Sequence, residues 1–174
     1  MLGLITAFTQ SQAGTFVEWA LPVGSPGSTA NLRTSSEPLH ILPTFDGDGS
    51  LFFTQRNLGY LGELNPENGA ITEWSLGSSS FPHDITMVGG TLVITEQGTD
   101  SIGQFDPRKS TIKEWLVPTS NSLPWHEARF GAFIYFSESD GNKIGRLNLR
   151  TNVIAEWNTP GVTPVGLDIS SNGR

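Results

Sequence analysis

The sequence predicts an all-β fold built from repeated four-stranded units, and three observations carry that prediction. A Glu-Trp dipeptide occurs at residues 18–19, 73–74, 114–115 and 156–157, and the last three tryptophans are 41 and 42 residues apart (115−74 and 157−115). A second landmark, an aliphatic residue followed by glycine at 61–62, 102–103 and 144–145, keeps the same spacing. Between these landmarks the apolar runs are short and show no helical periodicity. Repeats of this length are stacked supersecondary units.

Four strands fit into each repeat. In the second repeat we expect them at 82–88, 91–96, 101–106 and 111–117, separated by Gly89-Gly90 and by two turns rich in Gly, Asp, Pro and Ser. Those residues supply the backbone angles that tight reversals need. The third repeat follows the same pattern to Trp157, and the first begins at Pro38. A four-stranded meander of about 40 to 45 residues is the length of a β-propeller blade.

The strand count leaves an incomplete blade at each end. Residues 15–21 are expected to form the outer strand of a blade whose other strands are absent, and residues 164–168 to begin a fourth blade. We therefore expect a β-propeller domain over residues 15–174 with about three complete blades plus partial terminal ones. It would be an open arc, completed by further copies, or a fragment of a longer ring. Residues 1–14 form an N-terminal segment that fits a signal-peptide remnant or an arbitrary start inside a longer protein.

The charge and cysteine content of the sequence limit the kinds of binding partner that we expect. The 174 residues carry 10 Lys and Arg against 17 Asp and Glu, a formal net charge of −7, without a basic cluster. Nucleic acid and anionic membrane surfaces are therefore not expected partners. The sequence has no cysteine, which excludes disulfides and cysteine-ligated zinc. We expect a secreted or extracytoplasmic location in preference to a cytoplasmic one. We also expect the chain to self-associate through the blade faces that no neighbouring blade covers.

Candidate site residues follow from the hairpin that opens each blade, because the start of its first strand and the end of its second strand lie at the same end. His83 and His126 stand at the starts of first strands, and Glu96 and Glu138 at the ends of second strands. Imidazole beside carboxylate can perform general acid–base chemistry or hold a hard divalent cation. We therefore expect His83 and His126 to be catalytic, and Glu96 and Glu138 to bind a metal such as magnesium.

The same pattern has a structural interpretation. Thr-Glu or Ser-Glu at a fixed slot in a repeat protein often forms hydrogen bonds to the neighbouring blade, which would explain its recurrence without catalysis. The first repeat has Gln55 in the glutamate slot and His40 near its first strand, where a core histidine is the preferred interpretation. Two function classes stay open: an enzyme, and a noncatalytic propeller that binds a small-molecule or peptide ligand at its central face.

The repeat also resembles the virginiamycin B lyase family, or streptogramin lyases. The clearest copies are Phe-Ile-Tyr-Phe-Ser-Glu at 133–138, Gly-Asn-Lys-Ile-Gly-Arg at 141–146 and Pro-Val-Gly-Leu-Asp at 164–168, and the resemblance extends from residue 15 to the C-terminus. It implies a seven-bladed ring with a magnesium-dependent site at its mouth. There the lyases open the ester of a cyclic depsipeptide by elimination, with a histidine as general base and the metal stabilising developing charge.

Residue by residue, the family's two histidines on consecutive blades correspond to His83 and His126, and its second-strand glutamate ligand to Glu138. The glutamate that the family places two residues before the second histidine is matched here by Pro124. A gapless alignment of consecutive repeats at an offset of 42 sets His126 against Asp84. The resemblance therefore implies a magnesium-dependent carbon–oxygen lyase or a lactone hydrolase, with the noncatalytic binding propeller as the alternative.

Overall fold

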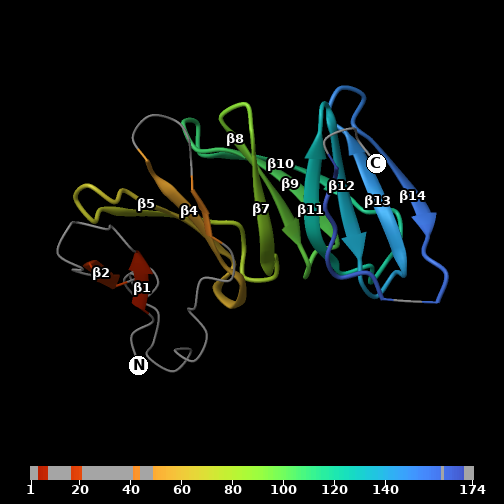
Figure 1. The fold of residues 1–174 in the computed structure, drawn as a ribbon, viewed down its shortest axis with the longest axis horizontal. Coiled ribbons are helices and arrows are strands. Elements are labelled where there is room, and N and C mark those ends of the chain that lie inside the picture. Colours follow the sequence, from red (N-terminus) through yellow and green to blue (C-terminus); the bar gives the residue numbers. More distant parts are fainter. Residues whose placement is uncertain (1–3, 8–16, 21–40, 44–48, 162, 171–174) are drawn as a thin grey trace.

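The structure, a computed structural model, describes residues 4–7, 17–20, 41–43, 49–161 and 163–170, the first three ranges by their backbone alone. It contains three antiparallel four-stranded sheets and one two-stranded sheet. Among the described residues the single helical piece is the 3₁₀ turn η1, Arg56–Leu58. The three large sheets stand side by side in chain order (Figure 1). The predicted all-β architecture of propeller blades is confirmed.

Each blade is a meander of four strands that pair in chain order. Blade 1 contains β3 (Ile41–Pro43), β4 (Leu51–Gln55), β5 (Tyr60–Leu64) and β6 (Ile71–Ser75). Blade 2 contains β7 (Pro82–Val88), β8 (Thr91–Glu96), β9 (Ser101–Asp106) and β10 (Thr111–Leu116). Blade 3 contains β11 (Pro124–Phe130), β12 (Phe133–Glu138), β13 (Lys143–Asn148) and β14 (Val153–Asn158).

The turns match the expected chemistry. Gly89 and Gly90, which join β7 to β8, have φ angles of 58° and 77°. Two successive residues in this left-handed region give the turn whose twist matches a two-residue β-hairpin. Asn142 and Asn152, in the two later turns of blade 3, also have positive φ, a conformation that asparagine tolerates better than most residues.

The glycine of the second landmark makes room for a side chain that crosses the sheet. A Cβ atom on Gly145 would lie 2.1 Å from Cζ of Phe136, and one on Gly62 would lie equally close to Cζ of Phe53. Each of these phenylalanines is opposite its glycine in the neighbouring strand. In blades 1 and 3 the far edge of the ring therefore occupies the space that a side chain would need at the glycine.

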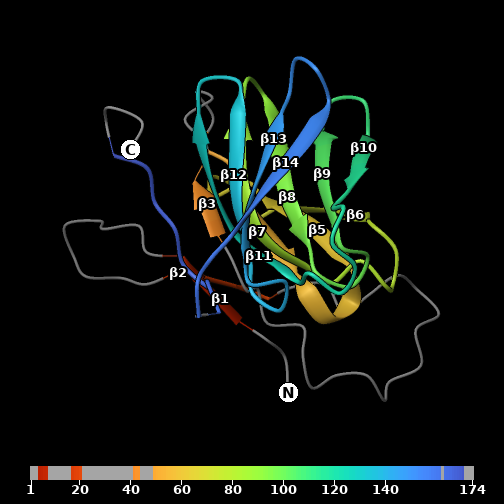
Figure 2. The ribbon, with the colours of Figure 1, turned by 90° about the vertical axis from the view of Figure 1, so that its right-hand side faces the viewer.

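The apolar core lies between blades, whose sheets stand next to one another in Figures 1 and 2. Trp74 of blade 1 packs against Phe105 of blade 2, with ring centroids 5.2 Å apart. One blade further on, Trp115 and Val117 join a buried cluster with Ile134 and other apolar residues of blade 3. The repeated tryptophan thus fixes one blade on the next, and the burial of this surface supplies the main stabilising free energy.

Blade 3 leaves the corresponding face uncovered. The side chain of Trp157 is 49% exposed, whereas Trp115 at the same place in blade 2 is 9% exposed. The guanidinium of Arg146 lies over the rings of Phe133 and Trp157, 4.6 and 5.1 Å from their centroids. These residues form an apolar and aromatic surface of the kind that blades 1 and 2 bury against their neighbours.

The chain after blade 3 differs from the expectation in one respect. Residues 164–168 were expected to begin a fourth blade, but the described residues 163–170 form no strand. The Ser137 hydroxyl nevertheless donates a hydrogen bond to the carbonyl of Val165, as corresponding hydroxyls of blades 1 and 2 do to the next first strand. The described residues 163–170 therefore make one contact that first strands make, although they form no ladder.

The N-terminal end also differs. Residues 15–21 were expected to be an outer strand without companions, yet β2 (Val17–Ala20) pairs in antiparallel fashion with β1 (Leu4–Ala7). The segment 1–14 thus contributes a strand. His40 and the terminal residues 171–174 lie outside the described residues, so the core role expected for His40 stays a prediction. No helix in the described part of the chain is long and apolar enough to cross a membrane, and the expected location stays a prediction.

Self-association through the uncovered face is expected, because apolar surface that blades 1 and 2 bury is here left in water. Sedimentation velocity on the chain at about tens of micromolar should show dimers or larger species. Trp157→Lys should shift the distribution toward the monomer, since it places a charge where the next blade would pack. A monodisperse monomer of the unmodified chain at these concentrations would contradict this expectation.

Candidate functional site

A β-bulge shapes the start of the first strand in blades 2 and 3. Pro82 pairs with Glu96 and Ile85 with Ile94, so that two residues of β7 stand opposite one residue of β8. The same irregularity recurs in β11, between Pro124 and Glu127. Bulges leave one backbone group without its ladder partner and redirect side chains, and they are frequent next to active sites. The bulged residues are His83 and Asp84 in blade 2, and Trp125 and His126 in blade 3.

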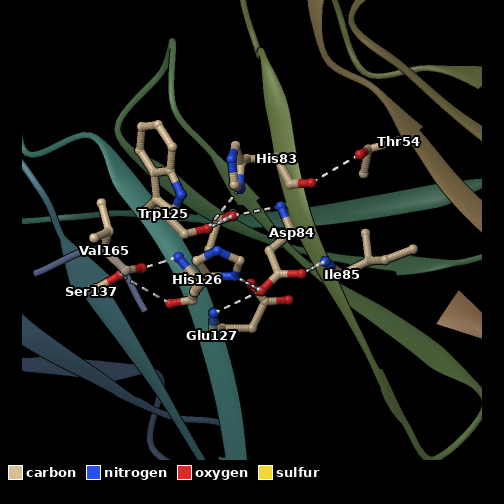
Figure 3. A network of polar contacts seen from close by, with 10 residues as sticks. Thr54, His83, Asp84, Ile85, Trp125, His126, Glu127, Ser137 and Val165 are labelled. Atoms are coloured by element: carbon tan, nitrogen blue, oxygen red, sulfur yellow. Dashed lines mark hydrogen bonds and ion pairs between the residues drawn. The ribbon is translucent and has the colours of Figure 1, made fainter. Parts of the chain in front are cut away.

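A side-chain hydroxyl from the second strand forms hydrogen bonds with backbone groups at each bulge. Thr95 Oγ1 accepts a hydrogen bond from the Asp84 amide at 2.9 Å and donates to the Trp125 carbonyl at 2.8 Å. Ser137 Oγ likewise accepts from the His126 amide at 3.1 Å and donates to Val165 of the following segment at 2.9 Å. The hydrogen bond that the sequence predicted from the Thr-Glu position to the neighbouring blade is confirmed for the threonine, Thr95. It connects the bulge of blade 2 with the bulge of blade 3 (Figure 3).

The bulges bring an acid and an imidazole from consecutive blades into contact. Asp84 Oδ2 lies 2.9 Å from Nδ1 of His126. The same oxygen accepts a hydrogen bond of 3.1 Å from the backbone amide of Glu127. A third of the His126 side chain is exposed, whereas Asp84 is more deeply buried. First strands of neighbouring blades contact each other, and this contact places the pair on the inner side of the sheets.

The contact fixes the tautomer of His126. An ionised carboxylate can only accept hydrogen bonds, so Nδ1 of His126 carries the proton. In the neutral ring the lone pair is then on Nε2, which is the basic atom. A carboxylate that holds a histidine in this orientation also stabilises the imidazolium that forms when Nε2 takes a proton. The Asp84–His126 pair therefore has the geometry of an oriented general base.

His83 is placed differently. Its side chain is 3% exposed, and its ring packs against Trp125, with centroids 4.5 Å apart, and edge-on to His126 at 5.4 Å. Its Nδ1 lies 3.1 Å from the Trp125 carbonyl and must donate, because a carbonyl only accepts. His83 is thus buried beside Trp125 and His126 (Figure 3), and its expected catalytic role stays a prediction.

The expected metal ligands Glu96 and Glu138 face acidic residues of their own blades. The pKa of Glu96 is raised to about 8 by burial and by the neighbouring carboxylate of Glu114. The pKa of Glu138 is raised to about 7 by burial and by Glu156, against the opposing effect of Lys143. In blade 1 the same slot holds Gln55, whose amide donates to the carboxylate of Glu73 at 2.6 Å.

These three pairs share one geometry. In each, a residue at the end of the second strand meets the glutamate of the Glu-Trp motif, 18 positions later in the sequence. The structure therefore gives both motifs a common packing role inside the blade. Glu114 and Glu156 were not singled out from the sequence, although the constant separation from Glu96 and Glu138 was a signal that could have identified them.

The fit of a metal ion can be tested on the donor set. Among the residues that the structure describes, no group of three or more His, Asp or Glu side chains is arranged to hold an ion. Magnesium usually keeps several water ligands and is held by one or two carboxylates, so magnesium binding by Glu96 and Glu138 stays a prediction.

The sequence predicted that the start of each first strand lies beside the end of the second strand of the same blade. Pro82 opposite Glu96 confirms that the start of the first strand and the end of the second lie together. The sequence alone indicated no role for Asp84 or Glu127, although an offset of 42 residues aligns Asp84 with His126. What the alignment could not show is that these two aligned residues from neighbouring blades contact each other.

Together, the blades and the bulge-borne cluster define the described chain as part of a β-propeller with a polar site at one end of its inner strands. Comparison with solved structures agrees. The chain is similar to a streptogramin B lyase, with 29% identity and a TM-score of 0.73 over 92% of this chain and 50% of that one. It is also similar to an inactive variant of virginiamycin B lyase from Staphylococcus aureus with quinupristin, with 26% identity and a TM-score of 0.74 over 91% and 50% of the two chains.

A similarity of fold alone extends to hydrazine synthase from Kuenenia stuttgartiensis, with 19% identity and a TM-score of 0.69 over 86% of this chain and 44% of that one. The chain spans about half the length of the lyases that it matches. No protein-family model matches the sequence, and no curated protein matches it.

Proposed function

We propose that this chain contributes the catalytic face of a lyase-like β-propeller that opens a cyclic ester or lactone, with His126 as general base and Asp84 as its orienting carboxylate. The observation that carries the proposal is the 2.9 Å contact between Asp84 Oδ2 and His126 Nδ1, formed by two bulges on neighbouring blades. The similarity to streptogramin B lyase supports the reaction class.

The proposed step is an elimination. Nε2 of His126 takes a proton from the carbon next to the one that carries the ester oxygen. The electron pair of that C–H bond forms a C=C bond, and the C–O bond breaks, so that its electron pair leaves on the carboxylate oxygen. The charge that develops on the imidazole is stabilised by Asp84, whose position is fixed by the Glu127 amide and by the clamp of Thr95 on its own amide.

The noncatalytic alternative is favoured by a different observation. His83, Glu96 and Glu138 are all buried, so His126 is the one predicted site residue with substantial exposure. A face with one accessible imidazole beside the partly buried Trp125 is suited to bind a small-molecule or peptide ligand through stacking and a hydrogen bond. Turnover distinguishes the two functions.

The test incubates the purified chain with quinupristin, the compound present in the solved lyase variant, and follows the product by mass spectrometry. Elimination opens a ring without changing its mass, whereas hydrolysis adds one water. We expect a ring-opened product of unchanged mass, and a loss of about 10³-fold to 10⁴-fold in kcat/KM for His126→Gln and for Asp84→Asn. Absence of turnover, or equal turnover by His126→Gln, would contradict the lyase and leave the binding propeller.

Magnesium is tested separately. The sequence predicts that the ion binds through Glu138 and Glu96, and titration calorimetry of the chain with magnesium chloride measures this directly. If the prediction holds, Glu138→Gln abolishes the binding heat while the circular dichroism spectrum is unchanged, because the amide and the acid are nearly isosteric. Gln55→Ala is the matched control, because Gln55 takes the place of the glutamate in blade 1 and pairs there with Glu73. This variant should bind magnesium as the unmodified chain does. Equal binding by Glu138→Gln, or none by either form, would remove the metal from the proposal.

A further inference from the structure

The carbonyl of Trp125 accepts two side-chain hydrogen bonds from blade 2. Thr95 Oγ1 donates to it at 2.8 Å, and Nδ1 of the His83 imidazole donates to it at 3.1 Å. This carbonyl belongs to the peptide group that joins Trp125 to His126, so both contacts act on the backbone directly before the proposed general base. A carbonyl oxygen has two lone pairs, and two donors together therefore fix the plane of this peptide group more closely than one donor does.

The hydroxyl contact recurs in all three blades, and the imidazole contact is an addition to it in blade 2. Thr54 of blade 1 donates to the His83 carbonyl at 2.8 Å, and Ser137 of blade 3 donates to the Val165 carbonyl at 2.9 Å. His83 follows the proline that opens β7, whereas the residue after the corresponding proline of β11 is Trp125. The repeat therefore joins its blades through the hydroxyl, and His83 adds a bond that this joint does not require.

The ring of His83 also contacts both side chains that flank this peptide group. Its centroid lies 4.5 Å from that of Trp125 and, edge-on, 5.4 Å from that of His126 (Figure 3). His83 is 3% exposed, whereas a third of the His126 side chain is exposed. A buried imidazole with these contacts is placed to act through its two neighbours.

The peptide group before His126 decides where the His126 ring lies. Nδ1 of His126 is 2.9 Å from Asp84 Oδ2, and its backbone amide donates to Ser137 Oγ at 3.1 Å. A rotation of the peptide group would move the Cα atom of His126, and with it the ring. The contact with Asp84 would then lengthen, and a hydrogen bond weakens steeply as its distance and angle depart from the optimum.

We infer that His83 is a positioning residue, which holds the peptide group between Trp125 and His126 and thereby keeps Nδ1 of His126 bonded to Asp84. This inference rests on the proposed function for its purpose, because an oriented imidazole matters only if His126 acts on a ligand. The hydrogen bond from His83 does not depend on which ligand that is.

The experiment uses two variants that separate the hydrogen bond from the packing of the ring. His83→Asn keeps an N–H donor near the place of Nδ1 and loses the ring, because the side-chain nitrogen of asparagine is as many bonds from Cα as Nδ1 is. His83→Phe keeps a ring against Trp125 and loses the donor. Thr95 still donates to the Trp125 carbonyl in both variants. Neither variant therefore leaves this carbonyl unpaired, and circular dichroism should show both folded.

The first readout is NMR of the ¹⁵N-histidine-labelled chain, which reports the tautomer of His126 and the solvent exchange of its Nδ1 proton. His126→Gln identifies the His126 signals, and Asp84→Ala, which removes the acceptor, shows the behaviour of an unbonded Nδ1 proton. We expect His83→Phe to raise the exchange rate by about tenfold or more, and His83→Asn to stay within about threefold of the unmodified chain.

The second readout is turnover of quinupristin, the compound present in the solved lyase variant. His83→Phe should lower kcat by about tenfold and change KM by less than about threefold, because the exposed side chains of the face remain while the base is misaligned. His83→Asn should keep kcat within about threefold of the unmodified chain. A packing role for His83 predicts the opposite order of the two variants.

The inference is overturned if His83→Phe matches the unmodified chain in both readouts, or if His83→Asn loses as much as His83→Phe does. If His83→Phe does not fold, His83→Gln replaces it, because its longer side chain carries the amide past the place of Nδ1. Absence of turnover in every form, with the NMR differences present, would reject the proposed function and keep the positioning role. Turnover by the unmodified chain, with the same His126 signals in all His83 variants, would do the reverse.

Discussion

Gly145→Ala is expected to destabilise the chain by about 3 kcal/mol, at the upper end of the cost of overpacking a core. The new Cβ atom would lie 2.1 Å from the ring of Phe136, and this ring is fully buried between blades 2 and 3. The ring cannot move without displacing the blade interface. Urea unfolding followed by tryptophan fluorescence measures the loss, because Trp115 belongs to the same cluster.

The chain supplies its own control in blade 2. A Cβ atom on Gly103 would meet Oε1 of Glu96 at 2.4 Å, the end of a side chain that can turn aside, and Ile94 takes the place of the phenylalanine. Gly103→Ala should therefore cost less than Gly145→Ala. Combining Gly145→Ala with Phe136→Ile, the residue of blade 2, should recover part of the loss, and a strictly additive double variant would contradict the steric explanation.

Glu96→Gln is expected to stabilise the chain by a few kcal/mol at pH 8 and to have little effect at pH 4. The pKa of Glu96 is raised to about 8 by burial and by Glu114. A raised carboxyl pKa means that the folded state binds the proton more tightly than the unfolded state does. That contribution to stability is complete below the ordinary pKa, near 4.5, and is lost as the pH rises toward 8. The free energy of unfolding of the unmodified chain should thus fall across this interval, while that of Glu96→Gln changes less.

Blade 1 provides the reciprocal variant. It already holds the amide–carboxylate pair Gln55–Glu73, so Gln55→Glu should create an acid pair in this blade as well and make stability fall more steeply above about pH 5. Glu114→Gln should relieve the same repulsion as Glu96→Gln, so the double variant should gain less than the sum of the two. If the free energy of unfolding changes equally with pH for the unmodified chain and for Glu96→Gln between pH 4 and pH 8, the raised pKa of Glu96 is contradicted.

The sequence by itself determined the fold. The spacing of the Glu-Trp and aliphatic-glycine landmarks predicted four-stranded blades, and the strands of blade 2 match the expected ones closely. This worked because blade structure is local: alternation of side chains, turn residues and a glycine under a crossing ring are all decided within about 40 residues. For the same reason the sequence predicts at which end of the strands the polar residues gather, because a hairpin pairs residues that are close in sequence.

The terminal pieces were predicted less well, because pairing needs a partner strand that a local pattern does not reveal. Residues 164–168 have a first-strand sequence, yet within the described residues they form no ladder. Leu4–Ala7 carries no repeat landmark, yet it pairs with β2.

Only the tertiary structure decided which polar residues meet. His83 and His126 were both expected to be catalytic, and the structure buries His83 and brings His126 against Asp84. Glu96 and Glu138 lie at the expected end of their strands, but the sequence did not show that each is close to a glutamate of its own blade, Glu114 and Glu156 respectively. The physical reason is that a side chain's direction depends on the strand register and on the neighbouring blade, and both are set by contacts between residues some 40 positions apart.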